Sequence, residues 1–431
     1  MLASDQATYP TSNMHGRNSD RKLMLFELDT RGHHPGYIQH LVKYWCDEKL
    51  SGHLDVLVSQ KFMQQHSNIV EIASQCEQQT INFVAITPEE QYVLFESSQL
   101  ENSFKGRIVR AFQEWDLVRK YAVSLGTTHC LLMYLDTILL RLAFGAKFPC
   151  NFSSIYFRPI FHYRTFANYT PARRESIWQL RDKVCLPQIL RSSELQSIFC
   201  LDPLAVEPIN KLTGKTKAVY LPDPVQIYNN TEPQLEKLKE SLGIDSSRQV
   251  FLLFGVLAER KGIYQLLEAV KMLSPDLCKK LCLLLIGPMQ LQEKELISAR
   301  ISEISQSLPV QIICRHDFVT DQEIQPYFQI ADVILAPYQR HIGMSAILVR
   351  AAAAQKPVLS SDFGLMGEVT CRYELGLAVD STVPTEITKG FTRFLRESPE
   401  NFGNKERMKQ FAEQNNANQF ATTIFKHLQV E

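Results

Sequence analysis

The chain has 431 residues, of which 45% are hydrophobic, and its 46 Lys and Arg balance 46 Asp and Glu. This length predicts two domains, each long enough to bury a core of its own. The net charge of zero gives no reason to expect a nucleic-acid partner. The ten cysteines are scattered and show neither a CxxC motif nor the Cys/His spacing of a zinc site, which favours reduced thiols in a cytosolic protein and no bound metal.

The N-terminal segment, residues 1–21, is polar and has no apolar stretch of the kind that a signal peptide needs. We expect a disordered leader there. The longest apolar run, residues 130–145, is interrupted by Asp136 and Arg141 and is too short to cross a bilayer. The sequence therefore predicts no transmembrane helix and a cytoplasmic protein.

Short apolar runs alternate with amphipathic or polar segments along the first half of the chain. The run at residues 22–30 is apolar on both faces, as a central parallel strand should be. It ends in a turn that contains Gly32, and an amphipathic helix follows over residues 38–50. Further elements are a long helix at 104–125 and strands at 54–59, 81–87, 128–136, 151–163, 198–202 and 218–225, of which the strand at 151–163 is broken by Pro159. This alternation predicts an α/β fold with a doubly wound sheet.

Between residues 103 and 195 basic side chains outnumber acidic ones, and several surround an expected helix that contains Trp178. These are Arg164, Arg173, Arg174, Arg181 and Lys183. One interpretation is a solvated helix face. The other is an acceptor patch or a peripheral contact with the inner face of a membrane, where the segment near Arg173 would attract anionic lipid headgroups.

A second α/β domain follows a Pro-Asp-Pro crossing, which places the boundary near Pro224. Buried strands are expected at residues 249–255, 282–288, 310–320, 331–337 and 356–362. The expected organisation is a leader at 1–21, domains at 22–224 and 225–403, and a closing helix at 404–431 that could pack back on the first domain.

Four motifs of the second domain follow one another in an ordered series: FGVLAERKG, ADVILAP, AAAAQKPVLSSD and GLMGE, within residues 254–368. In order and spacing this series resembles the donor half of glycosyltransferase family 4, the glycosyl transferases group 1, which have the GT-B fold. The resemblance implies two doubly wound Rossmann-like domains that face a central cleft. It also implies transfer of a hexosyl group from a nucleotide sugar, with retention of configuration and without a metal or other cofactor.

The resemblance assigns donor-binding residues in the second domain. Lys261 and Arg260 would grip the diphosphate, and the loop around Gly343 would offer N–H groups at a helix start. The full set implied is Gly255, Arg260, Lys261, Gly287, Phe318, Val319, Gly343, Met344, Ser345, Arg350 and Glu368. Simpler interpretations stay open: a surface lysine for Lys261, a helix N-cap for Ser345, and a carboxylate at a helix start for Glu368.

The sequence departs from the family pattern at three positions. The arginine of the first motif falls on Val256. Two glutamates that flank the glycine loop in the family fall on Ile342 and Arg350. An arginine cannot accept hydrogen bonds from ribose hydroxyls, so Arg350 is expected to pair with a phosphate or a carboxylate instead.

The acceptor side is expected at the carboxyl edge of the first sheet. The turn after the first strand, with Gly32, Gly36 and Tyr37, resembles a flexible acceptor loop. Candidate catalytic residues are His33, His34, Asp136 and Arg158. Asp136 could equally be a helix N-cap.

The leading hypothesis is a glycosyltransferase of carbohydrate biosynthesis that uses a nucleotide sugar and an acceptor glycan, lipid or small metabolite. One alternative is a degenerate GT-B protein that binds nucleotide sugar, or partners an active enzyme, without turnover. A second alternative is a nucleotide-sugar epimerase on the same fold.

Overall fold

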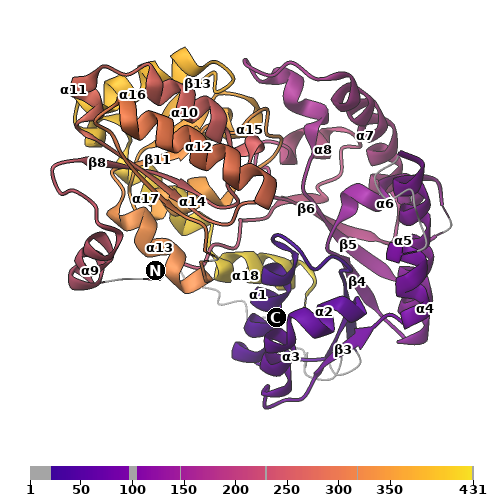
Figure 1. The fold of residues 1–431 in the computed structure, drawn as a ribbon. Coiled ribbons are helices and arrows are strands. Elements are labelled where there is room, and N and C mark those ends of the chain that lie inside the picture. The colour runs from indigo at the N-terminus through magenta and orange to yellow at the C-terminus, as the bar shows by residue number, and fades with distance from the viewer. Residues whose placement is uncertain (1–20, 97–103, 146, 229–230, 318, 430–431) are drawn as a thin grey trace, which may run out of the picture. The chain divides into compact units, whose positions relative to one another are not determined.

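The computed structural model describes residues 21–96, 104–145, 147–228, 231–317 and 319–429 (Figure 1). The expected leader, apart from Arg21, and the expected donor-binding residue Phe318 lie outside these residues. The chain divides into two compact units. The first comprises Met1–Ile155, Gln188–Phe199 and Thr422–Glu431, and the second comprises Tyr156–Pro187 and Cys200–Ala421.

A seven-stranded sheet has the order β3-β2-β1-β4-β5-β6-β7. Its strands are β1 (Lys22–Phe26), β2 (His53–Val58), β3 (Ile81–Ala85), β4 (His129–Leu132), β5 (Asn151–Tyr156), β6 (Leu195–Cys200) and β7 (Ala218–Tyr220). The pairs β1–β2, β2–β3, β1–β4 and β4–β5 are parallel. The strand order reverses between β1 and β4, which is the topological switch point of a doubly wound sheet.

The helices around this sheet are amphipathic. They are α1 (His34–Asp47), α2 (Gln60–Gln65), α3 (Ser67–Ser74), α4 (Pro88–Gln91), the π-helix η1 (Tyr92–Glu96), α5 (Phe104–Ser124), α6 (Leu135–Phe144) and the closing helix α18 (Ala417–His427). In α1 the apolar positions Ile38, Leu41, Val42 and Trp45 are all buried, as their helical spacing predicts. The ring of Phe425 in α18 packs against Trp45, so the end of the chain covers α1.

The second sheet has the order β10-β9-β8-β11-β12-β13, and all of its pairs are parallel. Its strands are β8 (Gln249–Phe254), β9 (Leu281–Ile286), β10 (Gln311–Arg315), β11 (Val333–Ala336), β12 (Val358–Ser361) and β13 (Gly376–Val379). Here the order reverses between β8 and β11. The prediction of two doubly wound α/β sheets is confirmed.

Helices and turns complete the second unit. They are η2 (Ile160–Thr165), α7 (Arg173–Arg191), α8 (Val206–Lys211), α9 (Glu232–Leu242), η3 (Glu259–Lys261), α10 (Ile263–Lys271), α11 (Pro275–Cys278), α12 (Leu291–Ser307), α13 (Asp321–Ile330), α14 (Ala346–Ala353), α15 (Gly364–Arg372), α16 (Pro384–Arg396), η4 (Pro399–Phe402) and α17 (Lys405–Gln414).

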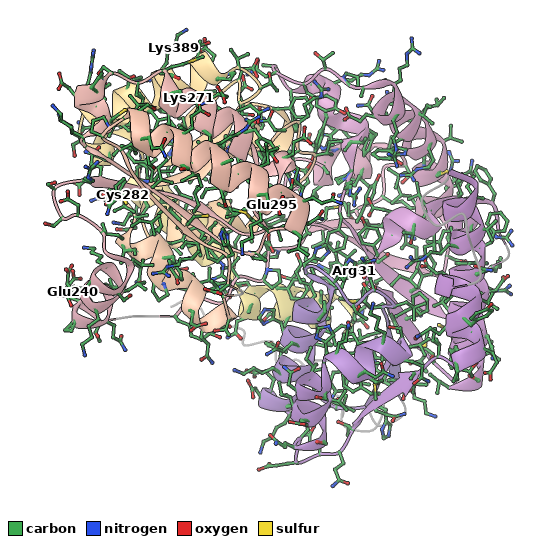
Figure 2. The ribbon with its side chains drawn as sticks, in the orientation of Figure 1. Arg31, Glu240, Lys271, Cys282, Glu295 and Lys389 are labelled. Atoms are coloured by element: carbon green, nitrogen blue, oxygen red, sulfur yellow. The ribbon has the colours of Figure 1, made fainter. Side chains whose placement is uncertain are left out.

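The core of the second unit lies on both faces of its sheet. Val250, Leu252 and Phe254 of β8 join one buried cluster, whereas Phe251 and Leu253 join another. Successive side chains of a strand point to opposite faces, so a strand buried on both faces must be apolar throughout. Cys282, which Figure 2 labels within the neighbouring strand, is likewise fully buried.

Two expected elements end at residues other than those that the sequence indicated. The strand expected at 151–163 ends at Tyr156, and the segment around Pro159 turns into η2, because proline fixes its own backbone and lacks an N–H for a ladder. The closing helix expected at 404–431 is two helices, α17 and α18. Between them Asn415 is buried and binds Tyr220 and the backbone N–H of Asp223, which interrupts the helical run.

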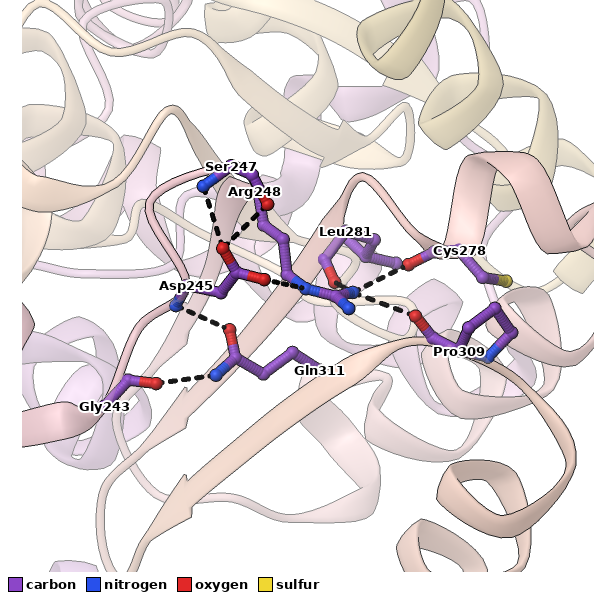
Figure 3. A network of polar contacts seen from close by, with 8 residues as sticks. All are labelled: Gly243, Asp245, Ser247, Arg248, Cys278, Leu281, Pro309 and Gln311. Carbon is purple, nitrogen blue, oxygen red and sulfur yellow. Dashed lines mark hydrogen bonds and ion pairs between the residues drawn. The ribbon is translucent and has the colours of Figure 1, made fainter.

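An arginine network holds the amino-terminal edge of the second sheet (Figure 3). Arg248 Nη1 donates to the carbonyl oxygens of Cys278, Leu281 and Pro309 at 2.9–3.1 Å. Its Nε lies 3.2 Å from an oxygen of Asp245. One side chain, just before β8, thus satisfies three carbonyls from the two segments that lead into β9 and β10.

Replacing Arg248 with Met should lower the free energy of unfolding by about 2–3 kcal/mol, because the three carbonyls lose a charged donor. Denaturant unfolding followed by circular dichroism measures this. Lys389→Met is the matched control, since Lys389 is 70% exposed at the outer surface of the second unit (Figure 2), and it should change stability by less than about 0.5 kcal/mol. Equal effects of the two substitutions would contradict the role given to Arg248.

Candidate functional site

The carboxyl ends of β8 and β11 meet at the switch point of the second sheet. Leu253 of β8 lies opposite Leu285 of β9 and Leu335 of β11. Crevices outside the carboxyl ends of parallel strands, at a switch point, are where open α/β sheets bind ligands. The segments that follow β8 and β11 carry most of the donor-binding residues expected from the sequence.

Lys261 is buried at this edge, with 5% of its surface exposed. Its Nζ donates to the carbonyl oxygen of Phe254 at 3.2 Å and to the hydroxyl of Tyr338. Nζ also lies 4.1 Å from the centre of the Tyr338 ring. Among the described residues no carboxylate comes within ion-pair distance of this ammonium group. A buried cation without a counter-ion is costly, so this edge is suited to receive an anion.

Further positive charge gathers around His341. Burial, together with the charges of Lys261, Arg260 and Arg158, lowers the pKa of His341 to about 4, although a contact with the carbonyl oxygen of Met344 acts in the opposite direction. The imidazole is therefore neutral at pH 7. It packs edge-on against Tyr338 with ring centres 5.2 Å apart. The predicted catalytic Arg158, which is exposed beyond β5 in the second unit, thus adds its charge to the donor side.

Two glycines allow the turn that contains Lys261 to approach the loop after β11. Gly255 has φ +103°, and a Cβ there would lie 3.2 Å from Lys261 Nζ. Gly262 has φ +77°, and a Cβ there would lie 2.1 Å from the carbonyl oxygen of Pro337. Both backbones are left-handed, a conformation that glycine adopts without strain. Gly262 of the first motif is therefore explained by the close approach of the backbone, just as Lys261 is explained by its charge.

Ser345 is the N-cap residue of α14, but its side chain makes no capping hydrogen bond. Its Oγ lies instead 3.2 Å from the hydroxyl of Tyr338. Before it, Gly343 has φ +106°, and Met344 and Ile342 pack against the core of the unit. The predicted loop Gly343–Ser345 thus meets Lys261 through Tyr338.

The remaining expected donor residues lie in varied surroundings. Arg350 is buried and its Nη1 donates to the carbonyl oxygen of Gln226 at 3.2 Å. Glu368 pairs with Arg372 one turn later in α15, at 2.9 Å. A Cβ at Gly287 would lie 2.3 Å from the carbonyl oxygen of Gly255, so this glycine allows the ends of β8 and β9 to approach each other. Val319 packs at the margin of the core.

The first unit has its own polar cluster at the switch point between β1 and β4. Glu27 follows β1 directly, is 6% exposed, and lies 2.5 Å from Nδ1 of His34. The acceptor turn is shorter than expected: Gly32 has φ +66°, but α1 begins at His34, so Gly36 and Tyr37 belong to the helix and not to a loop.

The N-cap interpretation of Asp136 is wrong, whereas the candidate role of His33 stays a prediction. Asp136 lies in the first turn of α6, whose N-cap is Tyr134, so Asp136 is not the N-cap. His33 is the residue before α1, is exposed, and stacks on the ring of His34 at 4.3 Å.

Three residues at these two edges were not expected from the sequence. Glu27 lies inside an otherwise apolar run, and a charge at the end of a central strand was the available signal. Tyr338 directly follows the ADVILAP motif, and His341 lies in the loop that was already singled out. Tyr338 binds Lys261 across 77 positions. Glu27 and His341 contact residues close to them in the sequence, through turns whose geometry the spacing of residues does not identify.

Two searches of the described parts of the chain give negative results. No group of three or more His, Cys, Asp or Glu side chains is placed to hold a metal ion. No helix in the described ranges combines the length and apolar character that a membrane span requires.

Removing the charge of Lys261 should raise the pKa of His341 from about 4 toward its ordinary range, since a nearby cation disfavours the imidazolium. NMR titration of the imidazole protons in the wild type and in Lys261→Met measures the shift. Burial still acts in the variant, so the rise should be partial. An unchanged pKa would mean that the two groups do not share one electrostatic environment.

Comparisons with known proteins agree with this fold. Residues 234–415 match the family described as Glycosyl transferases group 1. HepE from Anabaena, solved in complex with UDP, has a TM-score of 0.65 at 12% identity, covering 95% of this chain and 100% of that one. Sucrose-phosphate synthase from Thermosynechococcus elongatus has a TM-score of 0.63 at 14% identity, covering 95% and 98%.

A glycosyltransferase from Rickettsia africae has a TM-score of 0.61 at 12% identity, covering 96% of this chain and 99% of that one. No curated protein matches the sequence. At these identities the structures establish the fold, and the family match covers the part of the chain that carries the buried lysine. The resemblance drawn from the sequence is confirmed: residues 234–415 match the Glycosyl transferases group 1 family, in a chain with the two-sheet GT-B fold.

Proposed function

We propose that this protein transfers a hexosyl group from a nucleotide sugar to an acceptor, without a metal and with retention of configuration. The family match supports glycosyl transfer in general. The observation that carries the proposal is Lys261, a buried cation with no carboxylate within ion-pair distance among the described residues, at the switch point of the donor-side sheet.

In this proposal Lys261 stabilises the leaving diphosphate as the glycosidic bond breaks. Charge that develops in a transition state is stabilised most by groups held in place beforehand, and two hydrogen bonds already hold the ammonium group. Arg260 adds a second charge, and the N–H groups at the start of α14 add dipoles that favour an anion. A neutral His341 adds no further positive charge.

The donor base is proposed from the HepE structure, which contains UDP. A uridine nucleotide sugar is therefore the first donor to test, ahead of GDP- and ADP-sugars. Ile342 and Arg350 replace the two glutamates of the family pattern, so sugar hydroxyls would be held by other groups. This difference keeps the degenerate binding protein and the epimerase as the alternatives that an experiment must separate.

Lys261→Met should abolish most of the thermal stabilisation by UDP and UDP-sugars. Losing a hydrogen bond to a charged group costs about 1.5–3 kcal/mol, or roughly 10–150-fold in affinity. The unliganded variant should be at least as stable as the wild type, because a buried cation without a counter-ion is replaced by an apolar side chain. Differential scanning fluorimetry with and without nucleotide measures both effects.

Lys389→Met again serves as the control and should respond to nucleotide as the wild type does. If no nucleotide stabilises the wild type, or if Lys261→Met keeps the full response, the donor-site assignment is wrong. Stabilisation without turnover over a broad acceptor panel would support the degenerate binding protein. Conversion of the nucleotide sugar in the absence of acceptor would support the epimerase.

We further propose that helix α7 contacts an anionic membrane surface, which would bring a lipid-linked acceptor close. Its solvent-exposed face carries Ile177, Leu180 and Val184, which are 62%, 65% and 49% exposed. These positions follow helical spacing and so form one stripe. An apolar stripe of this kind, flanked by basic residues, is typical of helices that lie in a membrane interface.

The charges of α7 support the same partner. Arg173, Arg174 and Lys183 are exposed beside the stripe. The two acidic residues of the helix are buried and occupied: Glu175 accepts from the hydroxyl of Tyr169, and Asp182 from that of Tyr156. The exposed face is therefore apolar and cationic, which complements anionic lipid headgroups.

Arg173→Gln with Arg174→Gln should weaken binding to vesicles of phosphatidylcholine and phosphatidylglycerol by about 30-fold, since each basic residue contributes roughly 1 kcal/mol. Leu180→Glu should weaken it as well. Val123→Glu is the control, because Val123 is 68% exposed on α5. Vesicle co-sedimentation measures binding. Equal binding to pure phosphatidylcholine, or an equal loss with Val123→Glu, would contradict the proposal.

A further inference from the structure

A polar cavity of about 190 Å³ lies at the amino-terminal edge of the first sheet, at the opposite ends of the strands from the candidate acceptor residues. It has room for several water molecules or one small ligand. Among its lining residues, Arg21 precedes β1, whereas His53, His129 and Asn151 begin β2, β4 and β5. Because these strands are parallel, their starts lie side by side: Lys22 is opposite His53, and His129 is opposite Asn151.

Helix α1 and the end of the chain form the other walls of the cavity. Trp45 of α1 is buried and lines it, and its ring packs against Phe425 of α18. The residues shortly after this contact, His427, Leu428 and Gln429, line the cavity as well. Every lining residue belongs to the first unit, so the cavity is formed within one compact body.

Arg21 brings a positive charge to this cavity. Its Nη1 is buried and has no hydrogen-bond partner among the described residues. In the same part of the chain no carboxylate lies within ion-pair distance of the guanidinium, and no Asp or Glu lines the cavity. A guanidinium stays charged in proteins, and leaving a buried charged donor unpaired is costly. An anion that accepted a hydrogen bond from Nη1 would remove this cost.

The histidine at the start of β4 responds to the same charge. Burial, and then the charge of Arg21, lower the pKa of His129 to about 4. The imidazole is therefore neutral at pH 7, and its Nε2 lies 3.1 Å from the hydroxyl oxygen of Ser153. No described carboxylate counters Arg21 in this shift. The electrostatic potential in the cavity is therefore positive.

The other polar side chains of the cavity suit an oxyanion with several oxygens. Asn151 and Gln196 bring amide groups, and His53 and His427 bring imidazoles. The planar fork of an arginine matches the oxygens of phosphate, and hydrogen bonds from a charged donor are the strong ones. A phosphate group also has enough oxygens to accept hydrogen bonds from several strands at once.

We propose that this cavity binds a phosphate group, either as the free ion or on a small monoester, with Arg21 as its cationic ligand. The phosphate would accept from Arg21 Nη1 and from side chains at the starts of neighbouring strands. This site lies in the first unit, whereas the candidate donor edge lies in the second. The proposal therefore does not depend on sugar transfer.

The test is titration of the full chain with inorganic phosphate and with methyl phosphate, followed by NMR of the histidine imidazoles. The resonances of His53 and His129 should shift and give the dissociation constant of this cavity alone, apart from any phosphate bound near Lys261. Arg21→Met should weaken binding by roughly 10–150-fold, the loss expected for a hydrogen bond to a charged group. Arg21→Lys should restore part of it, because lysine supplies the charge without the fork.

Arg31→Met is the matched control and should bind phosphate as the wild type does. Arg31 follows the other end of β1 in the same unit, with 85% of its side chain exposed (Figure 2). Lys261→Met should also keep the shifts of His53 and His129, and Arg21→Met should keep the thermal response to UDP. These two results separate the cavity from the donor site. Denaturant unfolding should show that Arg21→Met is at least as stable as the wild type, since an unpaired buried charge is removed.

Unshifted His53 and His129 resonances with both probes, or full phosphate binding by Arg21→Met, overturn the proposal. An equal loss of binding in Arg31→Met overturns it as well. Equal shifts with acetate at the same concentration overturn the assignment of phosphate as the ligand. Tighter binding of methyl phosphate supports a monoester as the ligand, and tighter binding of inorganic phosphate supports the free ion.

Discussion

A buried lysine with no carboxylate in ion-pair distance among the described residues is the constraint on which the carboxyl edge of the second sheet depends. Lys261 stays buried because the carbonyl oxygen of Phe254 and the hydroxyl of Tyr338 accept its hydrogen bonds. Because Tyr338 is fixed in this way, its hydroxyl also reaches Ser345, whose side chain then caps no helix. The same positive charge helps to keep His341 neutral. One cation therefore binds a tyrosine that in turn reaches a serine, and its charge adds to the burial that keeps a nearby histidine neutral.

The topology explains why such groups collect at the carboxyl edge of each sheet. The strands at the centre of each sheet are buried on both faces and are apolar nearly throughout, so the polar groups of these edges lie in the segments that follow them. In each sheet the strand order reverses beside its first strand. The helices on either side of that point depart to opposite faces, and the loops leave room for side chains. Lys261 follows β8 and Glu27 follows β1 for the same topological reason.

The sequence predicted what depends on local pattern. Apolar runs located most strands, and helical spacing identified the buried face of α1. The order of the motifs identified Lys261, Gly255 and the loop before Ser345. The unpredicted parts depend on contacts between distant segments. Tyr338 binds Lys261 across 77 positions, and Asn415 binds Tyr220 across 195 and interrupts a helix that the local pattern continued. Gly36 was expected in a loop because helical spacing detects a helix only from its first apolar position. The helix α1 begins earlier, at His34, and so includes Gly36.

The two edges also differ in the sign of their electrostatic potential. The pKa values of two histidines, one at each edge, are shifted in opposite directions. Cations around His341 and its burial push its pKa down to about 4, whereas Glu27 raises that of His34 despite burial. An edge that resists protonation of an imidazole favours an anion, and an edge that promotes it favours the arrival of a proton. In the sugar transfer that we propose, negative charge develops on the leaving phosphate, and the cations around His341 suit that charge. The carboxylate beside His34 has the opposite sign, so the carboxyl edges of the two sheets attract different kinds of group.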